Sequence, residues 1–454
     1  MRPSRRSTLL SAALLAASGF TPAARAAGGG AGGTGRRRIA VPGAALRRIS
    51  RHDDLTTGAL AGTPCTDAAD WSGLTARGTR NPSGVPGVQI DGCFPDAPRR
   101  AAPHGGHHGA RFVIRLPDGW NGGLVVTGAP GTRGQYAMDT VVSDWVLAQG
   151  YAFAATDKGN SGPDFYTDGT RPGDALAEWN RRATELTRAA RATVARYYGH
   201  APRRTYMTGM SNSGYLTRWQ LENHPELYDG GVDWEGPLWR PDGPNLFTFL
   251  PTAVARQLGR AGDEDMYAAG FTRGTEFLWP YHEEVYWGLT QKTYRAVFDP
   301  GFDPACPGAS AGTTPGEILA PCPSDAGYDY AARPRSVHDA VARISLTGRI
   351  GKPMITLHGT LDALLPIGVQ SDVYARMVAD EGRSRLHRYY RIEGGTHVDG
   401  LYDTHPDRLR PILPCYRAAF TALTAWVEHR EEPPASGTVA RPDSGDLVNT
   451  GSLT

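Results

Sequence analysis

The sequence has little that is typical of a membrane protein or of a nucleic-acid-binding protein. No segment of the 454 residues reaches about 18 consecutive apolar residues, so none is long enough to cross a bilayer as a helix. The formal net charge is only +2; residues 1–26 hold four arginines and no acid, which leaves 2 − 4 = −2 for the remainder. Only three of the 48 basic residues are lysines, a skew that fits a GC-rich genome better than a basic binding surface.

Residues 1–26 nevertheless have the arrangement of a cleavable export signal. A basic start with Arg2, Arg5 and Arg6 precedes an apolar stretch and a small-residue exit. The paired arginines favour a twin-arginine signal, with an ordinary Sec signal as the alternative. We therefore expect a secreted protein whose residues 27–100, with a glycine-rich stretch at 28–35, form an N-terminal leader and extension.

Cysteine is also scarce, with five residues in the chain. An odd number in an exported protein predicts two disulfides and one spare thiol. We expect the local pairs Cys65–Cys93 and Cys306–Cys322, because each flanks a loop rich in proline, glycine and aspartate, although spacing alone leaves other connectivities open. Cys415 lies in an amphipathic stretch, which predicts a buried small side chain rather than a reactive thiol.

Hydrophobic residues make up 40% of the chain, enough for a large core, and they alternate between strand and helix patterns. The predicted strands are residues 112–116, 123–127, 151–156, 204–208, 230–233, 353–357 and 386–391. The predicted long helices are residues 175–198, 213–223, 368–379 and 413–429. This alternation predicts an α/β fold, with a mostly parallel central sheet and helices on both faces.

One long segment interrupts the alternation. Residues 236–349 are rich in proline, glycine and aromatic residues, and we interpret them as an inserted lid. The core then falls into residues 101–235 and residues 350–430. Residues 431–454 are rich in proline, serine, glycine and aspartate, which predicts a disordered tail.

A candidate nucleophile follows the predicted strand 204–208. The sequence GMSNSG at 209–214 lies between that strand and a helix, the context of a nucleophile elbow, where a tight turn requires small residues around Ser211. Ser213 takes the last position of the G-x-S-x-G pattern, and serine is small enough to fit there. The alternative is a strand-to-helix turn capped by serine and asparagine.

Partners for Ser211 come later in the chain, in the order acid and then histidine that an α/β-hydrolase requires. Asp362 and His397 each lie in a loop that follows a predicted strand. In this interpretation Ser211 attacks a carbonyl carbon, His397 takes its proton, and Asp362 orients the imidazole. Asp399 is the competing acid, and His358 is expected to be structural.

The oxyanion of such a reaction needs two N–H donors. One is expected to be the backbone N–H of Asn212, directly after the nucleophile. The second should follow the strand at 123–127. There we expect Ala129, because Pro130 has no N–H, with Gly131 as the alternative donor.

Lys158 follows the predicted strand 151–156 and is one of the few lysines. It is a candidate for binding an acidic group of the substrate, or for pairing with Asp157 or Glu235. The histidines at 104–108 lack a closed set of metal ligands, and no phosphate loop or dinucleotide fingerprint follows a strand. We expect no metal and no cofactor.

Three motifs resemble those of the serine α/β-hydrolase superfamily: GMSNSG at 209–214, HGTLD at 358–362 and GGTH at 394–397. The resemblance covers residues 112–429 with an insertion. It implies an α/β-hydrolase fold for this part of the chain.

Shorter matches, TDKG at 156–159 and the pair SN at 211–212, are similar to secreted esterases of the tannase and feruloyl esterase group and to 3-hydroxybutyrate oligomer hydrolases. Tannase-like enzymes commonly have cysteines beside the catalytic serine and histidine. This sequence has Met210 and Val398 at those positions, a departure from the tannase pattern.

We therefore expect a secreted carboxylic-ester hydrolase that works through an acyl-enzyme, with short hydroxyacyl oligomers as the first substrate to consider. Its partner is then a small-molecule or oligomeric ester, with no nucleic acid and no membrane span. The alternatives are a secreted serine peptidase, which uses the same triad, and a hydrolase-fold binding protein without activity. The three intact triad positions argue against the binding protein.

Overall fold

The structure is a computed structural model that describes residues 39–95, 109–160, 162, 165, 171–312 and 314–454. The predicted export signal, the glycines at the start of the leader and the histidines at 104–108 lie outside the described residues. In the part of the chain that is described, no helix has the length and apolar character needed to cross a membrane.

One ten-stranded sheet organises the molecule, with strand order β1-β2-β3-β5-β4-β6-β7-β8-β9-β10. The strands are β1 (Ala45–His52), β2 (Gly87–Phe94), β3 (Ala110–Pro117), β4 (Gly123–Gly128), β5 (Ala152–Thr156), β6 (Arg204–Met210), β7 (Gly230–Trp234), β8 (Met354–Gly359), β9 (His387–Ile392) and β10 (Gly437–Val439). Pairing is antiparallel from β1 to β5 through β3, and parallel from β5 to β10. The predicted mostly parallel sheet is confirmed.

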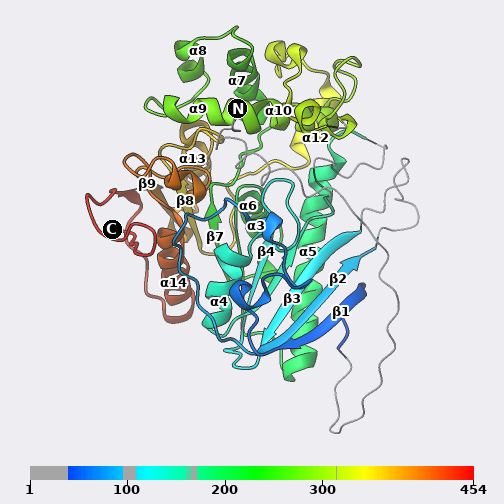
Figure 1. The fold of residues 1–454 in the computed structure, drawn as a ribbon, viewed down its shortest axis with the longest axis vertical. Helices are drawn as coiled ribbons and strands as arrows, with labels where there is room; N and C mark the ends of the chain where they lie inside the picture. The colour runs from blue at the N-terminus through cyan, green and yellow to red at the C-terminus, as the bar shows by residue number, and fades with distance from the viewer. Residues whose placement is uncertain (1–38, 96–108, 161, 163–164, 166–170, 313) are drawn as a thin grey trace, which may run out of the picture.

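Helices of the core cover both faces of this sheet (Figure 1). They are α2 (Thr57–Leu60), α3 (Ala68–Trp71), α4 (Asp144–Ala148), α5 (Asp174–Tyr198), α6 (Asn212–Asn223), α13 (Ser371–Asp380) and α14 (Leu413–His429). Successive strand residues point to opposite faces. A Cβ on Gly230 of β7 would meet Leu423 of α14, whereas one on Gly231 would meet Leu221 of α6, so α14 and α6 lie on opposite faces.

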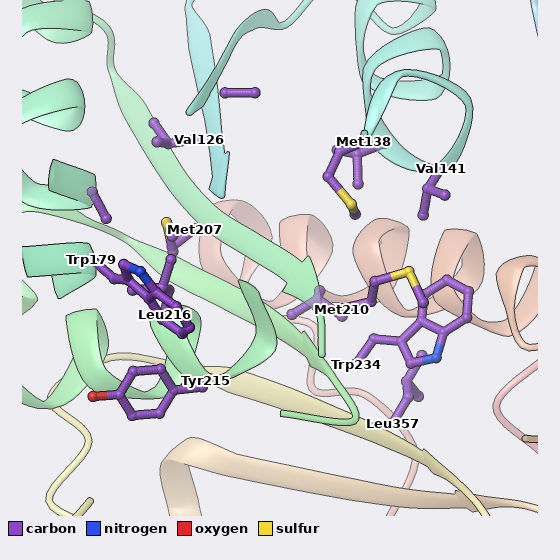
Figure 2. Close-up of a cluster of buried hydrophobic side chains, with 14 of the residues drawn as sticks. Val126, Met138, Val141, Trp179, Met207, Met210, Tyr215, Leu216, Trp234 and Leu357 are labelled. Carbon is purple, nitrogen blue, oxygen red and sulfur yellow. The ribbon is translucent and has the colours of Figure 1, made fainter. Parts of the chain in front are cut away.

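The core between sheet and helices is apolar and fully buried. Figure 2 shows part of it, where Val126 of β4, Met207 of β6 and Trp234 of β7 belong to one cluster with Trp179 of α5 and Leu216 of α6. Burying a side chain of this size contributes about 1.5–3 kcal/mol each, which holds the strands in register. That register pairs Met210 with Trp234, and Trp234 with Leu357, so the residues that follow β6, β7 and β8 emerge side by side.

The chain between β7 and β8 is helical, and Figure 1 shows its helices together at the top of the view. They are α7 (Leu250–Gln257), α8 (Asp263–Ala268), α9 (Trp279–Val285), α10 (Trp287–Phe298), α11 (Pro315–Leu319) and α12 (Arg335–Ala342). We call residues 236–349 the insertion. Its aromatic residues pack on one another; the rings of Trp239 and Phe298 stack with centroids 5.1 Å apart.

The predicted disulfide Cys306–Cys322 is confirmed, and it closes a loop within the insertion. The predicted pair Cys65–Cys93 is wrong, because both thiols are free. Gln89 Nε2 donates to the carbonyl of Cys65, and Gln89 precedes Cys93 by four residues on β2, which is roughly 13 Å along a strand. Cys415 is free and buried, as expected.

The structure also differs from the prediction of a disordered tail. Residues 437–439 form β10 and pair with residues 390–392 of β9. Farther along, Asn449 accepts a hydrogen bond from the backbone N–H of Arg80 through its side-chain oxygen. Composition alone predicted disorder, but an open sheet edge offers backbone partners that a segment poor in apolar residues can still use.

Candidate active site

Ser211 sits on a sharp turn between β6 and α6. Its backbone has φ 56°, in the left-handed region that costs free energy for any residue with a side chain. Glycines make room for this turn: a Cβ on Gly209 would lie 1.9 Å from Ser213 Oγ, and one on Gly214 would lie 2.6 Å from Asp233 Oδ1. The backbone therefore has the form of a nucleophile elbow.

Ser213, which departs from the usual motif, connects the turn to the neighbouring strand. Its Oγ accepts a hydrogen bond from the Gly128 N–H at 2.9 Å and lies 3.0 Å from Thr127 Oγ1. The side chain that replaces glycine thus fixes the end of β4 against the elbow.

The three residues predicted as a triad meet at this edge of the sheet. His397 Nε2 lies 3.0 Å from Ser211 Oγ, and His397 Nδ1 lies 2.8 Å from Asp362 Oδ2. The other oxygen of Asp362 accepts hydrogen bonds from the N–H groups of Leu364 and Leu365. This geometry can carry a proton from the serine hydroxyl to the imidazole while the carboxylate holds the ring.

Asp362 is fully buried but charged. Burial alone would raise the pKa of its carboxyl, but the neighbouring His397 and His358 hold that pKa well below its usual range. His358 Nε2 is 3.3 Å from Asp362 Oδ2, and His358 Nδ1 is 2.6 Å from Ser371 Oγ. His358 is therefore a second imidazole beside the carboxylate, held in place by Ser371.

The competing acid, Asp399, lies elsewhere. Its two oxygens accept hydrogen bonds from the N–H groups of Ile412 and Leu413, at the start of α14. Burial raises the pKa of Asp399 to about 7. It caps a helix and is not a hydrogen-bond partner of His397.

The structure contradicts Ala129 as an oxyanion donor. The Ala129 N–H donates to the Thr156 carbonyl at 2.9 Å, where the end of β4 continues its pairing with β5. Gly131, the alternative, has φ 50° and lines the same cavity as Ser211. Within the described chain, the backbone N–H groups of Gly131 and Asn212 donate to no protein acceptor, so both are available to a ligand.

Lys158 does not lie in the cavity, in contrast to the prediction that it binds substrate. Its ammonium is buried and donates to the Ala129 carbonyl, in the loop after β4, at 2.6 Å. Burial lowers the pKa of Lys158 to about 7. Asp157 pairs with Arg111 instead, at 2.7 Å, and it also caps the turn by accepting from the Gly159 N–H.

A cavity of about 130 Å³ opens onto Ser211 and His397. Its walls are mainly aliphatic and come from both regions: Leu246, Leu250, Val285 and Leu289 of the insertion, and Leu364 and Leu365 after β8. Tyr294 of the insertion reaches the elbow, where its hydroxyl donates to Asn212 Oδ1 at 2.9 Å.

Two charged residues lie at this site that the sequence did not predict as site residues: Arg133, and Glu235, which was considered only as a partner for Lys158. Arg133 lines the cavity, and its guanidinium donates to the carbonyls of Asp70 and Ser72. Glu235 follows β7, and its Oε2 lies 3.5 Å from His397 Nδ1. The available signal for Glu235 was an acid directly after a strand at the same sheet edge as Asp362, whereas nothing local distinguishes Arg133 from the other arginines.

Glu235, Asp362 and His397 also form a group of three side chains of metal-ligand type. Their oxygen and nitrogen atoms lie within 4.8 Å of one another. Two of these side chains already share the 2.8 Å hydrogen bond between His397 Nδ1 and Asp362 Oδ2. The group therefore has the geometry of a hydrogen-bonded acid–imidazole pair with a second acid beside it.

The sheet, the elbow and the order of serine, acid and histidine define the class: the chain has an α/β-hydrolase fold. Two family models match separate parts of it, "Tannase and feruloyl esterase" over residues 101–234 and "3HB-oligomer hydrolase (3HBOH)" over residues 319–450. The resemblance to this group that the motifs indicated is confirmed.

Individual proteins agree with these matches. The chain is 31% identical over 137 residues to mono(2-hydroxyethyl) terephthalate hydrolase of Piscinibacter sakaiensis, over 27% of this chain and 22% of that protein. It is 31% identical over 113 residues to D-(-)-3-hydroxybutyrate oligomer hydrolase of Azoarcus sp. (strain BH72), over 23% of this chain and 16% of that protein. The matched segments thus span about a fifth of these relatives.

A solved structure extends the likeness to most of the fold. Feruloyl esterase B from Aspergillus oryzae superimposes with a TM-score of 0.52 at 15% identity, covering 87% of this chain and 89% of that chain. At this identity the likeness shows the fold alone.

Proposed function

We propose that this protein is a carboxylic ester hydrolase in which Ser211 is the nucleophile, His397 the general base and Asp362 the acid that orients it. The observation that carries the proposal is the continuous line of hydrogen bonds from Ser211 Oγ through the His397 ring to Asp362, at the mouth of an aliphatic cavity. The names of the matching families and relatives, all hydrolases, support it.

In the acylation step, Ser211 Oγ bonds to the ester carbonyl carbon while His397 Nε2 takes the hydroxyl proton. The oxyanion accepts hydrogen bonds from the N–H groups of Asn212 and Gly131. The tetrahedral intermediate collapses, and the proton on Nε2 passes to the departing alcohol. Water then repeats the sequence on the acyl-enzyme and releases the acid.

We propose short hydroxyacyl oligomers as the first substrate class. Support comes from the names of the two relatives, whose substrates are esters that keep a free carboxyl group. The cavity suits such a molecule, because its walls are aliphatic and Arg133 is the one lysine or arginine among the described residues that line it. An Arg133→Gln variant should raise KM for an acid-ended ester and leave KM for its methyl ester unchanged.

We also propose that the protein is exported, through the twin-arginine signal that residues 1–26 resemble. The disulfide Cys306–Cys322 supports this, since disulfides persist in oxidising compartments. Mass spectrometry of the protein recovered from the culture medium tests it: the expected N-terminus lies shortly after Ala26, and a protein retained in the cells with Met1 would contradict export.

The activity is tested with purified protein and its Ser211→Ala variant, each given one mixture of 3-hydroxybutyrate trimer, methyl ferulate, a galloyl ester, a short-chain ester and an aminoacyl amide. Mass spectrometry identifies the products. Loss of an ester product in the variant supports both the nucleophile and the reaction. Ester products that persist in a folded Ser211→Ala protein would refute the triad, and cleavage of the amide alone would support a peptidase instead.

A further inference from the structure

A second carboxyl group, that of Glu235, faces the same imidazole as Asp362. Glu235 follows β7 directly, and its backbone N–H donates to the Leu357 carbonyl, so it extends the pairing of β7 with β8. Its side chain is fully buried; Oε1 accepts a hydrogen bond from the Gly359 N–H at 2.7 Å. The other oxygen, Oε2, lies 3.5 Å from His397 Nδ1.

This placement is unfavourable for folding in two respects. Glu235 has φ 54°, a left-handed backbone that residues with side chains rarely adopt. Its Oε2 is buried and makes no hydrogen bond of ordinary geometry among the described residues, with the Trp234 side chain near enough to lower the pKa of Glu235. A buried polar atom without a partner destabilises the folded state, and such costs persist where the residue has a use.

The charges around Glu235 determine its protonation. Burial and the negative charges of Asp362 and Asp399 raise the pKa of Glu235 well above its usual value. His397 faces it across 3.5 Å, and His282 of α9 faces Asp362 and His397 but stays neutral because burial lowers its pKa to about 3. Two carboxyls that share one site cannot both ionise readily, so Asp362 carries the charge and Glu235 the proton.

We propose that Glu235 is a positioning residue for His397, a second carboxyl group that can take over the role of Asp362 when Asp362 is replaced by a neutral residue. The inference rests on the proposed function of the triad. In the takeover, Glu235 Oε2 gives its proton to solvent and accepts the hydrogen bond from His397 Nδ1–H. During acylation His397 Nε2 then gains the Ser211 proton as before, and the imidazolium is balanced by the Glu235 carboxylate.

The test compares Asp362→Asn with the double variant Asp362→Asn/Glu235→Gln on one activated ester across pH. Removing the acid charge of a triad in this way typically lowers kcat about 10⁴-fold. We expect a loss of less than about 100-fold in Asp362→Asn, because Glu235 substitutes, and about 10⁴-fold in the double variant. Asp362→Asn should also need a higher pH than wild type to reach its plateau, because burial still raises the pKa of Glu235.

The control replaces a half-buried glutamate, Glu222, which accepts hydrogen bonds from Tyr374 and Gly348 away from the cavity. Asp362→Asn/Glu222→Gln should behave like Asp362→Asn. Equal activity of Asp362→Asn and Asp362→Asn/Glu235→Gln at every pH would overturn the inference.

Two further variants separate the possible failures. If Ser211→Ala keeps its activity, the proposed triad itself is wrong; if Ser211→Ala is inactive but the two acid variants are equal, only the role of Glu235 is wrong. Circular dichroism checks each variant for folding. Should Asp362→Asn not fold, Asp362→Ser, whose hydroxyl can still accept from the Leu364 N–H, takes its place in the same comparison.

Discussion

The sheet edge and the insertion contribute to one site by different means. At the sheet edge the backbone places the side chains: Ser211, Lys158 and Glu235 each follow a strand, and each has a positive φ. In the insertion, the structure is held by contacts between side chains, which are an aromatic core and the disulfide Cys306–Cys322. The comparison suggests that the reaction depends on the sheet edge and the choice of substrate on the insertion.

The largest effect should come from the sheet edge. His397→Ala removes the proposed base, and we expect kcat to fall about 10⁶-fold with KM nearly unchanged, because the base acts on the transition state more than on the bound ester. Steady-state kinetics on a soluble ester measures this. The control is His429→Ala, an exposed residue at the end of α14, which should keep wild-type kcat. A decrease in kcat of less than tenfold in His397→Ala would contradict the assignment of the reaction to the sheet edge.

The insertion should respond most to loss of its disulfide. The bond joins residues 16 positions apart, and a loop of this length gives about 3 kcal/mol of stabilisation in the chain-entropy model. We expect Cys306→Ala/Cys322→Ala to lose ester hydrolysis at lower urea concentrations than those that unfold the sheet, as followed by circular dichroism. Cys93→Ala, which removes a free thiol, should lose ester hydrolysis and unfold at the same urea concentration. Loss of both signals together in the double variant would show that the two regions unfold as one.

The sequence predicted the residues that follow strands, but it did not predict residues whose role depends on contacts with distant parts of the chain. Ser211, Asp362 and His397 were predicted because each lies in a turn or loop that follows a strand, and strand ends can be read from local pattern. Ala129 was chosen wrongly because a donor's availability depends on a partner far along the chain, the Thr156 carbonyl. Arg133 was not predicted, since what distinguishes it from other arginines is a hydrogen bond to the carbonyl of Asp70, a residue far away in the sequence, and a place in the cavity wall.

The two edge strands of the sheet, β1 and β10, were also not predicted from the sequence. Strand β1 alternates between exposed and half-buried residues and carries three arginines in Ala45–His52, so it has little apolar signal. Strand β10 is three residues long, within a segment whose composition predicted disorder. Both exist because a neighbouring strand offers a free backbone edge, and that information lies in β2 and β9 rather than in the segments themselves.

A smaller effect should follow from Ser213→Ala at the elbow. The change leaves the buried Gly128 N–H without its acceptor, which costs about 1–3 kcal/mol of folding free energy. Urea unfolding measures this loss. Thr421→Ala is the control, because its hydroxyl donates only to the Arg417 carbonyl within α14. An equal loss in both variants would mean that Ser213 does not connect the elbow to β4 more tightly than an ordinary hydroxyl.

The smallest effect tests the place where the two regions meet. Tyr294→Phe removes the hydroxyl that donates to Asn212 Oδ1, and we expect kcat to fall several-fold, about 1 kcal/mol, because in the proposed reaction Asn212 also supplies an oxyanion donor. Tyr330→Phe loses a hydrogen bond to the Pro241 carbonyl within the insertion and should change stability but not kcat. If both variants keep wild-type kcat, the insertion shapes the cavity without reaching the reacting atoms. If only Tyr294→Phe loses activity, the insertion helps to position the oxyanion donor. At this contact the insertion then contributes to the reaction as well as to the choice of substrate.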